Sequence, residues 1–146
     1  MIVNQQRDVQ IRQREYERFL SRVRRAVKLG RGEVTVCFVE DRTIARLNGK
    51  YRGKPRPTDV LSFPRNGNSA GRARFTEAPG SRVLGEIAIS PQAARRNAKR
   101  FGRTLGEEMR VLVLHGVLHL AGYDHETDDG EMEQIELRLR RKFGLR

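Results

Sequence analysis

Hydrophobic residues recur at helical spacing near the start of the chain. They are Tyr16, Phe19, Leu20, Val23, Ala26 and Val27. Their period predicts an amphipathic helix with an arginine-rich outer face and a stop at Gly30. A basic helix face is usually only solvated, so this one alone indicates no function.

Three shorter apolar runs have the length and composition of β-strands. They are Val34–Val39, Val60–Phe63 and Val83–Ile89. After the first run, Asp41 is expected to cap a short helix that carries Ile44 and Leu47. Residues 64–82 mix Gly, Pro, Arg, Asn and Ser without periodicity, which predicts a mobile basic loop.

Capping signals predict three more helices in the C-terminal half. A Ser-Pro pair opens the first helix, over 90–102, and a glycine ends it. A capping box of Thr104 and Glu107 opens the second, over 104–121. The third covers about 128–143. The order of elements predicts an α+β fold in which helices flank a small mixed β-sheet.

Length and composition predict one domain over residues 1–146. A chain of 146 residues with 37% hydrophobic content can bury a core of its own. No apolar run approaches the roughly 18 residues of a membrane span, and the start lacks a secretory apolar core. We therefore expect a cytoplasmic protein without a membrane partner. The single cysteine, Cys37, excludes an internal disulfide and is expected to pack within a strand.

All three histidines fall in the run His115-Gly-Val-Leu-His119-Leu-Ala-Gly122-Tyr-Asp-His125. His115 and His119 are four apart in a predicted helix, so they share one face about 6 Å apart along the axis. Gly122 can take the left-handed conformation that turns the chain back and brings His125 round as a third ligand. Three imidazoles suit one Zn²⁺ with an open fourth position, at the C-terminal end of this helix.

The alternative is three unrelated structural histidines. A lone histidine on an apolar helix face is more often a core residue with one hydrogen bond than a metal ligand. This helix is apolar nearly all round, which predicts burial, and buried imidazoles need partners. A shared metal ion supplies such a partner, so the clustering favours a metal site.

The histidine spacing also matches that of metzincin peptidases, but one of their residues is missing. Those enzymes place Glu directly after the first histidine as general base, and this chain has Gly116 there. A metal that lowers the pKa of water to about 7 could still deliver hydroxide to a phosphodiester. A metallopeptidase remains an alternative without its usual base.

The charge favours a polyanionic partner. Lys and Arg total 30 against 18 Asp and Glu, a net charge of +12. Residues 1–104 hold 24 basic and 9 acidic side chains, whereas residues 105–146 hold 6 and 9. We expect a basic track that holds the phosphates of a nucleic acid and leads them to the metal, although many of these arginines must be ordinary solvated surface.

A second segment, Tyr51–Pro64, bears Arg52 in a stretch that two prolines stiffen. Together with the Leu-Gly-Glu-Ile run at 84–87 and the histidine run, it closely resembles the YbeY family of bacterial metal-dependent endoribonucleases. The hallmark of that family is H-G-x-L-H-L-x-G-Y-D-H, and the chain matches it at every fixed position. The resemblance covers roughly residues 34–143.

The resemblance implies a single α+β domain with one zinc ion at the three histidines. It also implies cleavage of single-stranded RNA, maturation of ribosomal RNA, particularly the 3′ end of the small-subunit RNA, and ribosome quality control. The partners would be single-stranded RNA, ribosomal RNA and the small ribosomal subunit. The family's arginine carries over to Arg52. Two positions depart from the family pattern, since Pro55 replaces a common acidic residue and Glu86 replaces Asp.

On this interpretation the catalytic residues are Arg52, His115 and His119. Zn²⁺ would bind water or the scissile phosphate, while Arg52 would neutralise charge that develops in the transition state. The proton could pass to hydroxide at the metal, to Glu86 or to Asp124, and Asp124 could equally orient a ligand. The remaining alternative is a non-catalytic ribosome-binding module whose structural zinc takes a nearby carboxylate as fourth ligand.

Overall fold

Four strands of the computed structural model form one sheet, in the order β1-β2-β4-β3. They are β1 (Ile2–Gln5), β2 (Glu33–Val39), β3 (Val60–Pro64) and β4 (Val83–Ile89). Neighbouring strands run parallel except β3, which is antiparallel to β4, so the sheet is mixed as predicted. The structure describes residues 1–65, 83–124 and 126–145, so most of the loop predicted over 64–82 lies outside the described residues.

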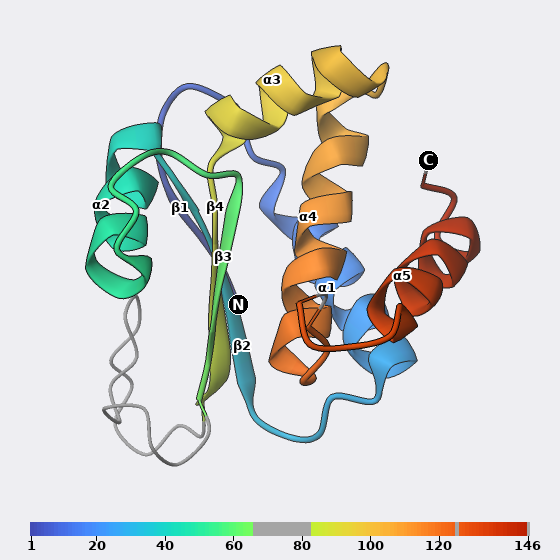
Figure 1. Cartoon of the computed structure of the whole chain (residues 1–146). Helices are drawn as coiled ribbons and strands as arrows, with labels where there is room; N and C mark the ends of the chain where they lie inside the picture. Colours follow the sequence, from blue (N-terminus) through green and yellow to red (C-terminus); the bar gives the residue numbers. More distant parts are fainter. Residues whose placement is uncertain (66–82, 125, 146) are drawn as a thin grey trace.

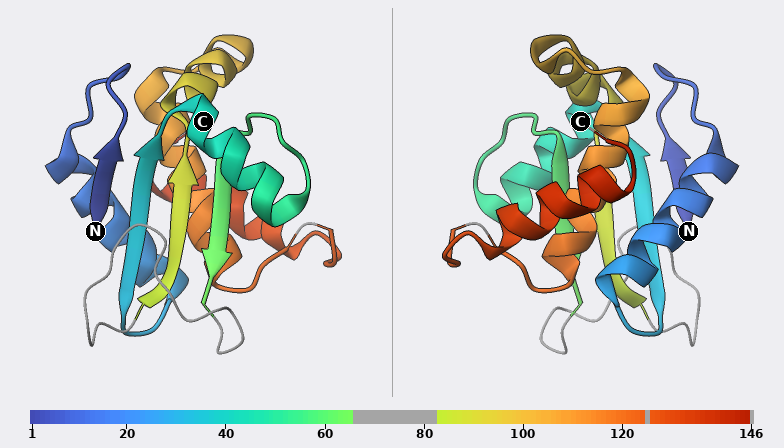
Figure 2. Two further views of the ribbon diagram at one scale, coloured as in Figure 1. Left: turned by 90° about the vertical axis from the view of Figure 1, so that its left-hand side faces the viewer. Right: turned by 90° about the vertical axis from the view of Figure 1, so that its right-hand side faces the viewer.

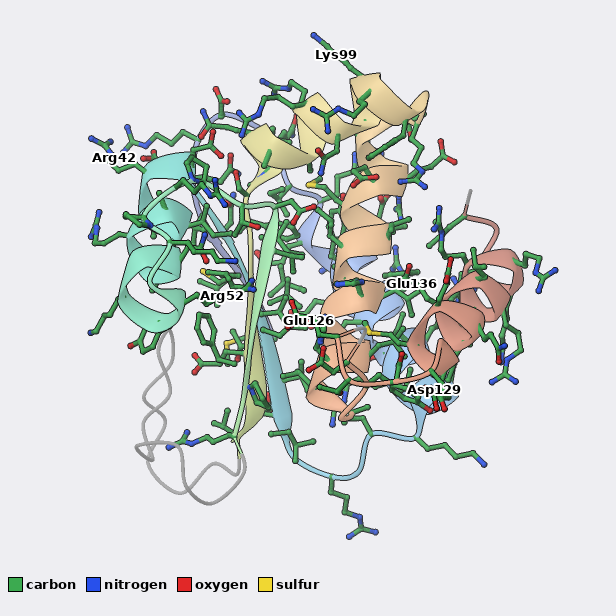
Figure 3. The ribbon with its side chains drawn as sticks, viewed as in Figure 1. Arg42, Arg52, Lys99, Glu126, Asp129 and Glu136 are labelled. Atoms are coloured by element: carbon green, nitrogen blue, oxygen red, sulfur yellow. The ribbon has the colours of Figure 1, made fainter. Side chains whose placement is uncertain are left out.

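Helices cover both faces of this sheet (Figures 1 and 2). They are α1 (Gln13–Val27), α2 (Asp41–Arg52), α3 (Pro91–Phe101), α4 (Leu105–Leu120) and α5 (Glu131–Lys142). Charged side chains such as Arg42 on α2 and Lys99 on α3 project outward from them (Figure 3). The predicted α+β domain is confirmed. None of these described helices is long and apolar enough to cross a membrane.

The two faces of the sheet bury two different clusters. Side chains of a strand alternate between faces, so Val36 and Ile87 pack against α1, α4 and α5. Cys37 and Ala88 point the other way and pack with Ile44 of α2. The histidine helix α4 therefore lies on one face and α2 on the other, with the edge strand β3 between them.

Strand β1 is not predicted from the sequence. Ile2 is buried and pairs with Val36 of β2, whereas Asn4 and Gln5 are exposed. A strand of four residues with a polar second half has no periodicity that could distinguish it from a loop. Its strand conformation comes from pairing with β2, since strand propensity depends on the neighbours that a segment meets.

Helix α1 ends at Val27 and not at the predicted Gly30. Lys28 adopts the left-handed conformation (φ 58°) as its C-cap. The Arg24 guanidinium donates hydrogen bonds to the carbonyl oxygens of Gly30 (3.0 Å) and Gly32 (2.6 Å). These bonds hold the turn that follows, so the helix ends before the glycine is reached.

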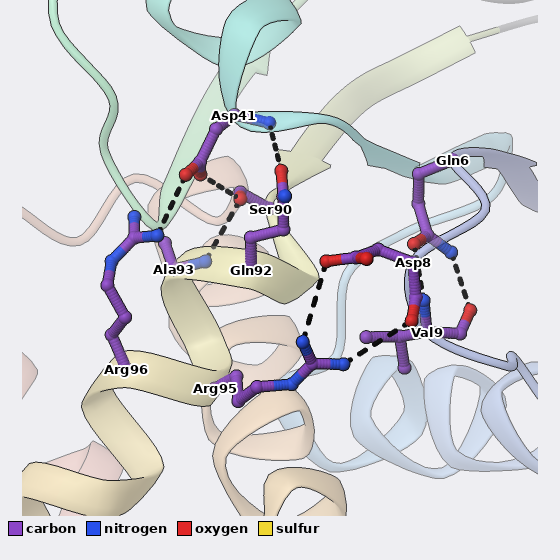
Figure 4. Close-up of polar contacts among 9 residues, drawn as sticks. All are labelled: Gln6, Asp8, Val9, Asp41, Ser90, Gln92, Ala93, Arg95 and Arg96. Atoms are coloured by element: carbon purple, nitrogen blue, oxygen red, sulfur yellow. Dashed lines mark hydrogen bonds and ion pairs between the residues drawn. The ribbon is translucent and has the colours of Figure 1, made fainter.

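Asp41 is the first residue of α2, and its N-cap is Glu40, so the predicted capping role of Asp41 is wrong. Its carboxylate instead accepts hydrogen bonds from Ser90 (2.6 Å) and Arg96 (2.8 Å), which join α2 to α3 (Figure 4). Burial raises the pKa of Asp41, but these bonds and the charge of Arg96 outweigh it and hold that pKa below its ordinary value. Ser90 also caps α3, as predicted, by accepting from the Ala93 N–H.

The ends of the last two helices follow local hydrogen bonds. The capping box of α4 is confirmed, since Thr104 and Glu107 exchange two bonds of 3.1 Å. Helix α5 begins at Glu131 and not at Asp128. Asp128 stays outside the helix because its carboxylate accepts from the Met132 N–H (2.9 Å).

Candidate metal centre

A cavity of about 560 Å³ lies beside the edge strand β3. Its walls come from the end of α2, from β3, from the second half of α4 and from the turn after α4. The lining residues are Arg52, 58–62, Pro64, His115, His119, 122–124 and Glu126. This volume falls in the usual range for ligand sites. Three of the predicted site residues, Arg52, His115 and His119, therefore meet in one cavity.

Helix α4 presents His115 and His119 from successive turns into this cavity. Their Nε2 atoms lie 3.1 Å apart, and their ring centroids 4.6 Å apart. Two imidazole nitrogens that bind one tetrahedral zinc ion at ~2.0–2.1 Å lie about 3.3 Å from each other. The two rings are therefore spaced to hold a single metal ion.

Glu136 of α5 orients the first of these rings. Its Oε1 lies 2.7 Å from Nδ1 of His115, and Nη1 of Arg140 lies 3.8 Å from its Oε2. A carboxylate that accepts from Nδ1–H places the ring's lone pair on Nε2, the nitrogen that lies toward His119. The sequence analysis missed Glu136, because an i,i+4 Glu–Arg pair looks like any exposed helix pair until α5 is packed against α4.

The turn after α4 has the predicted shape. Gly122 takes a positive φ of 99°, and the chain turns there toward Asp124 and Glu126 at the cavity wall. The Asp124 carboxylate accepts from the Glu126 N–H at 3.0 Å. The third proposed ligand, His125, lies outside the described residues, so its role stays a prediction.

Glu86 lies on the opposite face of the sheet from the histidines. Glu86 is buried on the α2 face, beside Cys37. Burial and, to a smaller extent, the charge of Glu86 raise the pKa of the Cys37 thiol to about 12. The neighbouring Ile87 points the other way, toward Gly116 of α4. Of the two carboxylates that the sequence left open as proton acceptors, only Asp124 therefore lies in the cavity.

Gly116 faces the sheet at close range. A Cβ at this position would lie 2.7 Å from Cγ2 of Ile87, and its carbonyl oxygen accepts from Ser62 of β3 at 3.1 Å. A glutamate here would collide with β4 and would not reach the cavity. The base of the peptidase alternative therefore has no room at its usual position.

Arg52 is the last residue of α2, and Gly53 ends the helix with a positive φ of 70°. Asn48 anchors the following loop by donating from its side chain to the Arg56 carbonyl at 3.0 Å. The Arg52 side chain is exposed and lines the cavity. Within the described part of the chain it makes no ion pair, so its charge is available to an anion beside the histidines.

Comparison with known proteins identifies the family of this chain. A family model described as Endoribonuclease YbeY matches residues 1–144. The chain belongs to the YbeY endoribonuclease family. Membership confirms the family and the class of enzyme predicted from the histidine motif, a hydrolase that acts on RNA.

Individual relatives are similar over most of their length. A protein of Koribacter versatilis described as endoribonuclease YbeY is 41% identical over 145 residues, which cover 99% of this chain and 86% of the relative. One of Solibacter usitatus with the same description is 42% identical over 92% of this chain and 82% of the relative. The solution structure of a Thermotoga maritima protein matches with a TM-score of 0.62 at 32% identity, over 99% of this chain and 90% of that one.

Proposed function

We propose that this YbeY family member is a zinc-dependent endoribonuclease that cleaves single-stranded RNA. The observation that carries the proposal is the meeting of a paired-histidine face and a free guanidinium in one cavity. The histidines fit a metal ion, and the guanidinium fits a phosphate. Together they can bind a phosphodiester and stabilise the charge that develops at its reacting centre.

The proposed zinc ligands are His115, His119 and His125. Three neutral imidazoles leave a fourth position open, which distinguishes a catalytic site from a closed structural one. When bound, the ion supplies Lewis-acid chemistry and a water of lowered pKa. Glu136 keeps His115 in the tautomer that presents Nε2 to the ion.

The remaining cavity residues act on the substrate. Arg52 binds the scissile phosphate and stabilises the charge that accumulates on its oxygens in the transition state. Three described carboxylates line the cavity, those of Asp59, Asp124 and Glu126. Asp59 accepts from the Asn97 side chain at 3.0 Å, whereas Asp124 and Glu126 lie on the turn that follows His119 and are positioned to hold or accept a proton there.

The substrate class follows from charge and shape. A net charge of +12 attracts RNA, and the cavity of about 560 Å³ between β3 and α4 is where one strand would enter. An RNA duplex presents its bases stacked and paired, so a strand must be free to enter. The family resemblance supports a finer proposal, which is cytoplasmic maturation of the 3′ end of small-subunit ribosomal RNA and ribosome quality control on the small subunit.

One experiment tests metal, substrate and activity together. Protein of measured zinc content is given labelled single-stranded RNA, the same sequence as a duplex, and casein. We expect about one zinc per chain, cleavage of the single strand, and little turnover of the other two. His119→Ala should lose most of its zinc and its cleavage, because two imidazoles hold zinc far less tightly than three.

Arg138→Gln, on the exposed face of α5, is the matched control and should retain both zinc and cleavage. Casein turnover with intact RNA would establish the peptidase alternative. Full zinc content with no turnover of either substrate would establish the non-catalytic module.

A further inference from the structure

Two further hollows continue the cavity along the surface. One of about 300 Å³ shares Gly122 and Tyr123 with the cavity and is also lined by the segment 27–30. The other, of about 780 Å³, shares Lys28, Leu29 and Gly30 with the first. The three hollows adjoin through these shared residues, from the histidines past the turn after α4 to the C-terminal end of α1, and we call this row of hollows the groove.

Four cations line the far end of this groove, and one of them is Arg24. The other three are Arg25, Lys28 and Arg31, which we call the basic cluster. All three side chains are exposed, and none makes an ion pair with another residue in the described part of the chain. Their neighbour Arg24 is different, since its guanidinium is used to hold the turn at Gly30 and Gly32.

The backbone at Lys28 provides a second, independent observation. Lys28 is the one described non-glycine residue with a positive φ, 58°. A left-handed conformation is unfavourable for a residue with a Cβ, and glycine is the usual residue at such a helix end. Lys28 thus places a cation in the lining of two of the hollows, at a position where glycine would relieve the strain.

We propose that the basic cluster is a second RNA subsite, which binds phosphates of the strand several nucleotides away from the bond that is cut. The proposal rests on the endoribonuclease function and adds the path that the strand takes beyond the cavity. The position of the cluster on a groove that leads to the histidines distinguishes it from ordinary solvated charge.

The test compares RNA that reaches the cluster with RNA that does not. Binding is measured by fluorescence anisotropy for an oligonucleotide of about 12 nucleotides and for a trinucleotide, within the usual range of single-strand site sizes. The triple variant Arg25→Gln/Lys28→Gln/Arg31→Gln should bind the longer RNA at least tenfold more weakly and the trinucleotide within twofold of the unsubstituted protein. Its log-log salt slope on the longer RNA should be shallower by about 2, at ~0.7 per lost phosphate contact.

A matched control removes equal charge elsewhere. Arg14→Gln/Lys99→Gln/Arg100→Gln alters three exposed cations that line none of these hollows. An equal loss of affinity in the control, or an unchanged Kd in the cluster variant, would overturn the subsite. Because binding is measured apart from cleavage, a failure of the proposed enzymatic function would show separately, as uncut RNA.

The variant Lys28→Gly tests whether weaker RNA binding could come from a less stable fold. Glycine relieves the left-handed strain, so this variant should have a higher melting temperature than the unsubstituted protein. It should nevertheless bind the longer RNA several-fold more weakly, because one phosphate contact is lost. Raised stability with unchanged affinity would remove Lys28 from the subsite.

Discussion

Substitutions of Arg52 can distinguish metal binding from catalysis. A guanidinium stays protonated and has no lone pair for zinc, so its role in the cavity is electrostatic. We expect Arg52→Ala to keep full zinc content and near-native stability but to lose on the order of 10²-fold or more in cleavage rate. Arg52→Lys should recover only part, because a point charge cannot reproduce the bidentate fork.

Single-turnover cleavage at saturating RNA measures this effect, with zinc determined on the same samples. Arg46→Ala is the matched control, because it is an exposed arginine of the same helix that does not line the cavity. Unchanged turnover in Arg52→Ala would show that Arg52 takes no part in the reaction and that its loop is only a docking surface.

Glu136 acts on the metal through His115. Glu136→Gln keeps the volume of the side chain but removes the charge that polarises Nδ1–H, so we expect zinc affinity to fall by ~10- to 100-fold. Competition with a chromogenic chelator measures the Kd. Glu133→Gln, on the exposed side of α5, should leave it unchanged. Equal zinc affinities of Glu136→Gln and Glu133→Gln would show that Glu136 contributes only to packing.

At the scale of elements, the contact between α4 and β4 positions the histidines. Gly116→Ala would place a Cβ 2.7 Å from Cγ2 and 2.9 Å from Cδ1 of the buried Ile87. The helix or the strand must then shift. We expect a loss of about 1–3 kcal/mol in the free energy of unfolding and weaker zinc binding, because His115 moves with the helix.

Gly106, in the first turn of the same helix, is the internal comparison. A Cβ there meets only the far end of the flexible Arg110 side chain, at 3.0 Å. Gly106→Ala should therefore stabilise the protein, by up to ~1 kcal/mol from helix propensity. Chemical denaturation measures the free energy of unfolding of Gly116→Ala and Gly106→Ala. Two changes of the same sign would show that close approach to the sheet is not what requires glycine at 116.

At the scale of the whole molecule, the metal should stabilise the fold. Zinc that binds only the folded chain adds free energy by mass action, about 2.7 kcal/mol when its free concentration is 100-fold above Kd. A chelator should therefore lower the melting temperature, and added zinc should restore it. The melting temperature of His119→Ala should change neither with the chelator nor with added zinc. A chelator-insensitive melting temperature in the unsubstituted protein would contradict a tightly bound ion.

The sequence by itself determined what depends on neighbouring residues. The helical period of α1, the capping box at Thr104 and the left-handed turn at Gly122 are set by bonds and φ angles within a few positions. The pairing of His115 with His119 is equally local, because one helical turn joins them. For the same reason the family could be recognised from a run of eleven residues.

Only the tertiary structure decided what depends on residues far apart in the chain. Pairing with β2 makes a strand of β1, and packing across β3 brings Arg52 to the histidines. The side-chain alternation of β4 sends Glu86 to the face away from the cavity, and the docking of α5 brings Glu136 to His115. None of these contacts leaves a periodic or capping signal, because each depends on which surfaces pack together once the elements have formed.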